Sequence, residues 1–226
     1  MEKTCPVCGG QGTLTMRVLW PELIQEWGLA PHEVDYIDRQ QGELCVHCHA
    51  SRRHVALTEA FRTALGDTRT LREIVAAAPQ ISVLDINGAE VISDTLSGLP
   101  HYLRADYPEV DLQALPYAEN SFDIVLHSDT LEHVPYALRA LDECRRVLKP
   151  GGTLCYTIPI IVGRMTRSRL GMPPSYHGMP SDNRDDYIVQ TEYGADAWTE
   201  LARAGFTQIG IHTVDFPVAQ AFTARK

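Results

Sequence analysis

The sequence lacks long apolar runs and any excess of basic charge. No apolar run approaches the roughly 20 residues that cross a bilayer, and residues 1–5 lack the apolar stretch of a secretory signal. The net charge of −9 at pH 7 argues against nucleic acid as a partner, because phosphate contacts need a basic face. We therefore expect a cytoplasmic protein that binds neither membranes nor nucleic acid.

The length and composition are those of a folded enzyme. The 226 residues suffice for one α/β domain and a small appendage, and 44% of them are hydrophobic. That hydrophobic share is ordinary for a globular protein, so the composition gives no sign of disorder.

Cysteines are few, but four of the six form two pairs with two residues inside each pair. In a reducing compartment such pairs indicate metal binding rather than disulfides. Four thiolates complete the closed tetrahedral shell of structural zinc, whereas a catalytic zinc keeps one position open. We predict a structural Zn²⁺ site whose ligands are Cys5, Cys8, Cys45 and Cys48.

The predicted zinc module comprises residues 1–66. Residues 19–27, between the two cysteine pairs, read as a short helix with two tryptophans that packs on the main domain or covers its cleft. A helical pattern follows the second pair and forms a linker. His47, His49 and His54 could each replace a cysteine as ligand, although four cysteines already satisfy zinc. Cys144 and Cys155 are expected to be buried apolar residues.

Alternating strand and helix patterns begin near residue 80. They predict a second domain, residues 67–226, with a mostly parallel, Rossmann-like sheet and helices on both faces. The predicted elements are strands at 81–86, 101–106, 121–128 and 153–158, helices at 135–148 and 195–204, a tight turn at 149–152 and two final strands.

Three polar side chains stand where predicted strands end. Asp85, Asp106 and His127 should meet at the carboxyl edge of the sheet, where such folds bind ligands. A carboxylate ending the second strand can accept hydrogen bonds from both hydroxyls of a ribose. A dehydrogenase uses the same device, so the fold alone does not separate the two functions. Each carboxylate could also cap the turn that follows it.

Several motifs of the second domain resemble the type 11 branch of class I S-adenosylmethionine-dependent methyltransferases. The resemblance is close over residues 81–158, and residues 51–54 and 173–178 resemble a zinc-bearing subgroup of these proteins. The motifs that carry it are residues 83–86, 111–117, 120–123, 131–134, 146–152 and 204–206.

The resemblance implies a set of cofactor contacts. The methionine end would lie against Asp85 and the turn that follows it, the ribose against Asp106, and the sulfonium near the end of the third strand. The implied residues are Asp85, Asn87, Gly88, Asp106, Asp111, Leu112, His127 and Ser128, with Asp111 and Leu112 at the adenine.

The turn after the first strand departs from the family pattern. The family has several glycines here, but this chain keeps only Gly88 within residues 87–91. The backbone can approach the cofactor less closely, and side chains occupy the space. The link between Asp106 and Asp111 is also too short for the usual helix. We expect the cofactor to bind in a modified pose.

Methyl transfer needs a base only when the acceptor is protonated. The candidate catalytic residues are His127, His133, Tyr176 and His177, although a lone histidine is more often structural. Tyr176 and His177 lie in a long Pro/Gly-rich segment that could cover the site.

The expected substrate is a small molecule. The leading hypothesis is methylation of oxygen or nitrogen on a natural product or saccharide. The alternatives are a cyclase or lyase that releases methylthioadenosine without a second substrate, and a non-catalytic interaction module. Arg164, Arg167, Arg169 and Arg184 form either a solvated loop or a clamp for an anionic substrate.

Overall fold

The computed structural model describes residues 4–176 and 185–226. Its centre is one six-stranded sheet built from β3 (Ser82–Ile86), β4 (His101–Ala105), β5 (Phe122–Ser128), β6 (Leu148–Thr157), β10 (Gln208–Val214) and β11 (Ala219–Arg225). The strand order is β10–β11–β6–β5–β3–β4. The pairs β3–β4, β3–β5 and β5–β6 are parallel, whereas β11 pairs antiparallel with both β6 and β10. This confirms the predicted Rossmann-like sheet.

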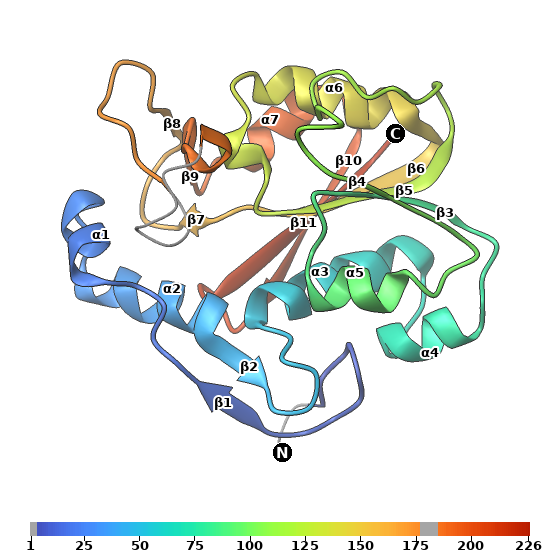
Figure 1. The fold of residues 1–226 in the computed structure, drawn as a ribbon, viewed down its shortest axis with the longest axis horizontal. Coiled ribbons are helices and arrows are strands. Elements are labelled where there is room, and N and C mark those ends of the chain that lie inside the picture. The colour runs from blue at the N-terminus through green and yellow to red at the C-terminus, as the bar shows by residue number, and fades with distance from the viewer. Residues whose placement is uncertain (1–3, 177–184) are drawn as a thin grey trace.

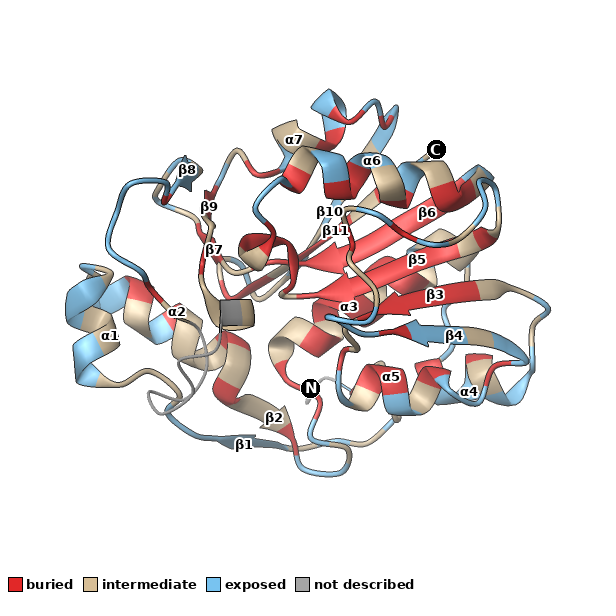
Figure 2. Cartoon of the chain, turned by 45° about the horizontal axis from the view of Figure 1, so that its top comes forward, coloured by how far each residue is buried: buried red, intermediate tan, exposed pale blue. Residues whose placement is uncertain are grey.

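Helices cover both faces of this sheet (Figure 1). One face carries α6 (Ala137–Val147) and α7 (Trp198–Arg203), and the other carries α3 (Arg52–Leu65), α4 (Leu71–Ala76) and α5 (Val91–Leu96). Figure 2 shows that the central strands are buried while the edge strand β4 is largely exposed. In the part of the chain described here, no helix combines the length and apolar character needed to cross a membrane.

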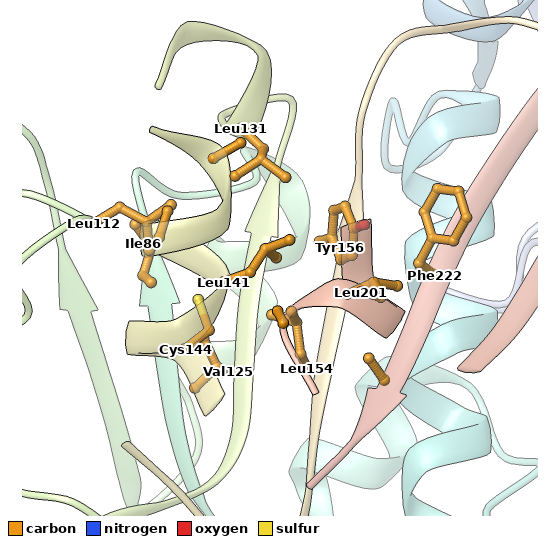
Figure 3. Packing of buried hydrophobic residues seen from close by; sticks show 14 of the residues in the cluster. Ile86, Leu112, Val125, Leu131, Leu141, Cys144, Leu154, Tyr156, Leu201 and Phe222 are labelled. Atoms are coloured by element: carbon orange, nitrogen blue, oxygen red, sulfur yellow. The ribbon is translucent and has the colours of Figure 1, made fainter. Parts of the chain in front are cut away.

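Two hydrophobic clusters hold the layers together. On the α6 face, Leu141 and Cys144 pack among Val125, Leu154 and Tyr156 of the central strands (Figure 3). The second cluster joins the opposite face to α3, α4 and α5, and Cys155 points into it. Cys144 and Cys155 are both fully buried, as predicted.

The N-terminal segment forms a small two-stranded sheet with a helical insert. β1 (Thr13–Thr15) pairs antiparallel with β2 (Glu43–Cys45). The insert holds α1 (Pro21–Glu26), which the sequence predicted, and a longer helix, α2 (Pro31–Gly42), which it did not. Pro31 at the first helical position and the Glu33 carboxylate, which accepts a hydrogen bond from the Ala30 N–H at 2.8 Å, mark the start of α2.

The helix α3 connects this segment to the main sheet. The Ser51 hydroxyl caps its start, and Gly66, with φ of 65°, ends it in the left-handed conformation. α3 packs on β11, β6 and β10 of the main sheet. Cys5 and Val7 of the N-terminal segment belong to the same hydrophobic cluster as the strands of the sheet. The boundary between residues 66 and 67 stays a prediction. It assigns α3 to the zinc module, but α3 packs on the sheet of the larger domain as one of its covering helices.

A third small sheet lies beside the insert, and we call it the flap sheet. It consists of β7 (Ile160–Ile161), β8 (Arg167–Ser168) and β9 (Thr191–Gly194), in the order β7–β9–β8. The sequence predicted an irregular segment here. The Trp27 indole N–H donates to the Ser175 hydroxyl at 2.9 Å. The insert therefore contacts the flap sheet region of the main domain, and packing on that domain was one of the two positions predicted for it.

The described arginines of the flap region are held by ion pairs. Arg164 binds Glu33 at 2.8 Å and donates to the backbone carbonyls of Trp27 and Gly28, while Arg167 and Arg169 both bind Glu192. None of the three lines the cavity at the carboxyl ends of β3, β4 and β5. Arg184 lies outside the described residues. An anionic substrate therefore stays a prediction without support from these contacts.

Candidate functional site

A cavity of about 590 Å³ opens at the carboxyl ends of β3, β4 and β5. Because β4 and β5 lie on opposite sides of β3, this is the point where the strand order reverses and where such sheets bind ligands. Six of the eight predicted cofactor residues line the cavity, namely Asn87, Gly88, Asp106, Asp111, Leu112 and Ser128.

The turn after β3 keeps a glycine-like shape with only one glycine. Asn87 and Gly88 have φ of 60° and 68°, a conformation that asparagine tolerates better than most residues. The Asn87 side-chain oxygen accepts a hydrogen bond from the Tyr107 N–H at 2.8 Å, and the Asn87 N–H donates to the Ala105 carbonyl at 2.9 Å. The asparagine therefore ties the turn to the end of β4.

Asp85 lies behind this turn and does not line the cavity. Its carboxylate accepts hydrogen bonds from the Tyr102 hydroxyl at 2.6 Å and from the Ser93 hydroxyl, which in turn accepts from the Ala89 N–H. Burial raises the pKa of Asp85, while these two hydrogen bonds oppose the rise. Asp85 therefore braces the turn through Ser93, and the structure does not support its implied direct contact with the methionine end.

His127 is placed differently from the prediction. It shares the face of Val125, which packs under α6, and its ring lies 4.7 Å from the Tyr156 ring. The side chain is fully buried, does not line the cavity, and has no hydrogen-bond partner among the described residues. Burial lowers the pKa of His127 to about 3, so the imidazole is neutral at pH 7. This geometry assigns His127 to the core and not to proton transfer or sulfonium contact.

A neutral core histidine makes stability depend on pH. The unfolded chain protonates His127 below about pH 6.5 while the folded chain does not, so stability is lost as the pH falls from 6.5 toward 3. Between pH 7 and pH 5 we expect wild type to lose about 2 kcal/mol more than His127→Phe. Urea unfolding of both proteins at the two pH values measures this difference, and an equal loss in both would contradict it.

Of the predicted catalytic residues that the structure describes, one lines the cavity. His133, in the short helix η1 (Leu131–His133), faces it together with Tyr187 of η2 (Asp185–Tyr187). The His133 Nδ1 lies 3.0 Å from the Ile188 carbonyl, which can only accept, so Nδ1 carries the proton. Tyr176 forms a β-bridge with Ile188 and does not line the cavity. The remaining candidate, His177, lies outside the described residues.

The sequence did not predict the ion pair at the floor of the cavity. Asp129, just after β5, binds the Arg53 guanidinium at 2.8 Å and also accepts hydrogen bonds from Gln41 at 3.0 Å and Thr157 at 2.9 Å. Burial alone would raise the pKa of Asp129, but Arg53 and these hydrogen bonds hold it below its usual range. We call these four side chains the Asp129 junction, because Gln41 and Arg53 reach it from the N-terminal segment.

The four paired cysteines converge in the structure. Their sulfur atoms all lie within 4.8 Å of one another, and Cys5–Cys48 and Cys8–Cys45 are each separated by 3.8 Å. Four thiolates at about 2.3 Å from one zinc ion in a tetrahedron lie about 3.8 Å apart. Two of the sulfur–sulfur distances therefore match the spacing around a tetrahedral zinc ion.

The backbone around each cysteine pair has the same hydrogen bonds. The Cys5 N–H donates to the Gly10 carbonyl at 2.8 Å, and the Cys45 N–H donates to the Ala50 carbonyl at 2.9 Å. Each turn directs its two thiols inward. The alternative histidine ligands are not part of the group among the described residues, and His54 Nδ1 instead accepts from the Ser51 N–H at 3.1 Å.

Comparison with known proteins agrees with this geometry. Residues 63–156 match the family described as "Methyltransferase domain". A demethylmenaquinone methyltransferase of Paenarthrobacter aurescens is 27% identical over 72% of this chain and 78% of its own length. A ubiquinone/menaquinone biosynthesis C-methyltransferase of Haemophilus ducreyi is 39% identical, but over only 36% of this chain and 32% of its own length.

The solved structures that resemble this chain share little sequence identity with it. The CurJ carbon methyltransferase is 15% identical, with 90% of this chain and 69% of that chain covered and a TM-score of 0.45. Among the curated relatives, several are matched over no more than about half of their length. The sheet, the cavity and the family match agree. The chain therefore has a Rossmann-like methyltransferase fold, and its residues 63–156 match the methyltransferase-domain family.

Proposed function

We propose that this protein transfers the methyl group of S-adenosylmethionine to an oxygen or nitrogen atom of a small molecule. The observation that supports this most is the cavity at the carboxyl edge of the sheet, which gathers Asp106, Asp111 and Leu112 beside the turn after β3. Five carboxylates and two arginines line it, so its charge is negative. The cofactor carries a sulfonium and an ammonium, and a negative cavity suits such a ligand.

The lining residues fit the parts of the cofactor. Asp106, 47% exposed in its side chain, would accept hydrogen bonds from the ribose hydroxyls, and Leu112 would contact the adenine. When bound, the cofactor supplies a methyl group on a positively charged sulfur. The chain's own residues position the acceptor and remove its water.

His133 is the proposed base for a protonated acceptor. Because Nδ1 carries the proton, the neutral ring presents its lone pair at Nε2. The Glu132 carboxylate lies 3.5 Å from Nε2 and would stabilise the imidazolium that proton transfer produces. The Tyr187 ring packs edge-on against His133, with ring centroids 6.5 Å apart, and limits its rotation.

We also propose that the cysteine cluster binds one structural Zn²⁺ ion. The four thiolates would fill all four coordination positions of a tetrahedral ion, so no position would be left for a substrate. The cluster packs against the core of the domain, since Cys5 and Cys45 are buried within the second hydrophobic cluster. A protruding adapter, as in the non-catalytic hypothesis, has no support from this packing.

Product analysis tests the proposed reaction. The purified protein is incubated with S-adenosylmethionine alone and with a panel of small oxygen and nitrogen nucleophiles, and the sulfur products are identified by mass spectrometry. We expect S-adenosylhomocysteine that depends on an acceptor. Methylthioadenosine from the cofactor alone would instead establish the cyclase or lyase alternative, and neither product, with no cofactor binding, would contradict both.

A variant of Asp106 tests the assigned site. We expect Asp106→Asn to raise the KM for S-adenosylmethionine about tenfold while leaving the KM for the acceptor unchanged, because hydrogen bonds to a charged acceptor are lost. Glu109→Gln is the matched control, since it removes an exposed carboxylate from the same loop outside the cavity. Equal effects of the two substitutions would refute the assignment.

A further inference from the structure

The side chain of Arg104 occupies the space above the turn after β3. A Cβ atom placed on Gly88 would lie 2.6 Å from the Arg104 Cζ, and 2.7 and 2.8 Å from its Nη2 and Nη1 atoms. The guanidinium therefore rests directly on the glycine backbone. Both residues line the cavity. The guanidinium therefore lies beside the turn in which Gly88 is the one remaining glycine.

Among the described residues, only the Nε edge of this guanidinium has a hydrogen-bond partner. The Arg104 Nε lies 2.9 Å from each of the Asp106 carboxylate oxygens. Neither Nη1 nor Nη2 has a hydrogen-bond acceptor among the described residues. The Asp106 hydrogen bond raises the pKa of Arg104, so the group remains charged. Arg104 thus presents a positively charged pair of donors inside a cavity whose other lining charges are mostly negative.

The second arginine of the cavity differs in this respect. Arg53 directs Nη1 to Asp129 at 2.8 Å and Nη2 to Glu90 at 3.1 Å, so both terminal nitrogens already bind carboxylates. A further anion at Arg53 would meet two negative groups. Of the two arginines, only Arg104 combines a free donor pair with a position on the turn.

We propose that Arg104 binds the carboxylate of the amino-acid end of S-adenosylmethionine and thereby replaces contacts that the missing glycines would have given through the backbone. This inference rests on the proposed function. A carboxylate can accept two parallel hydrogen bonds from a guanidinium edge, and Nη1 and Nη2 offer that pair. Asp106 holds the guanidinium from the Nε side and leaves the other edge toward the ligand.

Two ligands distinguish binding of the amino-acid end of the cofactor from binding of its adenosine end. S-adenosylhomocysteine carries the amino-acid end, whereas methylthioadenosine keeps the adenosine and lacks that end. We expect Arg104→Gln to weaken S-adenosylhomocysteine binding about tenfold to hundredfold and to change methylthioadenosine binding less than about threefold. Arg104→Lys should recover part of the loss, because it keeps the charge but not the paired geometry.

Calorimetric dissociation constants for both ligands measure these effects. Arg72→Gln is the matched control, because Arg72 is an exposed arginine on α4 outside the cavity, and we expect it to bind both ligands as wild type does. Equal weakening of both ligands by Arg104→Gln would reduce Arg104 to a structural role. Tighter binding of both would show that Arg104 competes with the ribose for Asp106. Either result overturns the inference, whereas absence of S-adenosylhomocysteine binding to wild type would overturn the proposed function itself.

Discussion

Replacing Cys48 with serine is expected to release the metal ion and to destabilise the whole domain by on the order of 5 kcal/mol. Cys48 is one of four sulfurs that lie within 4.8 Å of one another, and the binding energy of a structural metal is also folding energy. The effect should extend past the N-terminal segment, because α3 begins four residues after Cys48 and packs on the central sheet.

Metal content and unfolding have to be measured together for this variant. Elemental analysis should find one zinc per wild-type chain and much less in Cys48→Ser, and urea unfolding should show the loss of stability. Cys144→Ser is the matched control: it buries an unpaired hydroxyl at a cost of about 1–3 kcal/mol but lies outside the cluster, so its zinc content should equal that of wild type. Wild-type protein without metal, or a serine variant as stable as wild type, would contradict the zinc assignment.

Asp129→Ala is expected to cost about 3–5 kcal/mol, because it leaves the Arg53 guanidinium nearly buried without its main partner. Each side chain of the pair is only 12% exposed. Gln41 and Thr157 would lose their shared acceptor as well. Since Asp129 and Arg53 line the cavity, the affinity for S-adenosylhomocysteine should fall along with stability.

A second substitution distinguishes the ion pair from simple loss of packing. The double variant Asp129→Ala with Arg53→Met removes both charges and should recover part of the lost stability. Glu59→Ala, which breaks the surface pair of Glu59 with Arg62 on α3, should change the free energy of unfolding by about 0.5 kcal/mol or less. A double variant less stable than Asp129→Ala would argue against the uncompensated charge as the cause.

The sequence predicted the elements whose pattern is strong. The strand predicted at 121–128 is β5, Phe122–Ser128, and the helix predicted at 135–148 is α6, Ala137–Val147. The helix has clear apolar periodicity, and the strand contains a continuous apolar run, Ile124–Leu126. The helix α2 was missed because its residues are mostly polar and its start depends on a proline and a glutamate cap. The two-residue strands β7 and β8 are too short for any periodicity to show.

In the candidate site, too, residues whose position follows from the local sequence were predicted, whereas contacts between distant segments were not. The strand-end argument placed Asp106 at the carboxyl edge of the sheet, because parallel strands bring their carboxyl ends together, whereas Asp111 was implied only by the family resemblance. The contacts of Arg53 and Gln41 with Asp129 join residues 76 and 88 positions apart, and no local pattern signals them. His127 was misplaced because the end of a strand fixes its position along the chain but not the face on which its side chain points.

The packing of α3 on β11 bears on the order of folding. β11, Ala219–Arg225, lies between β6 and β10, and α3 from the first third of the chain packs on it. Such contacts have a high contact order, and an elongating chain must be synthesised past residue 225 before they can form. Because Arg53 lies on α3 and lines the cavity, we expect this part of the cavity to form late in folding. During synthesis, the part of α3 that packs on β11 therefore stays uncovered until the last strand of the sheet has been made, and chaperones or other chains can bind it until then.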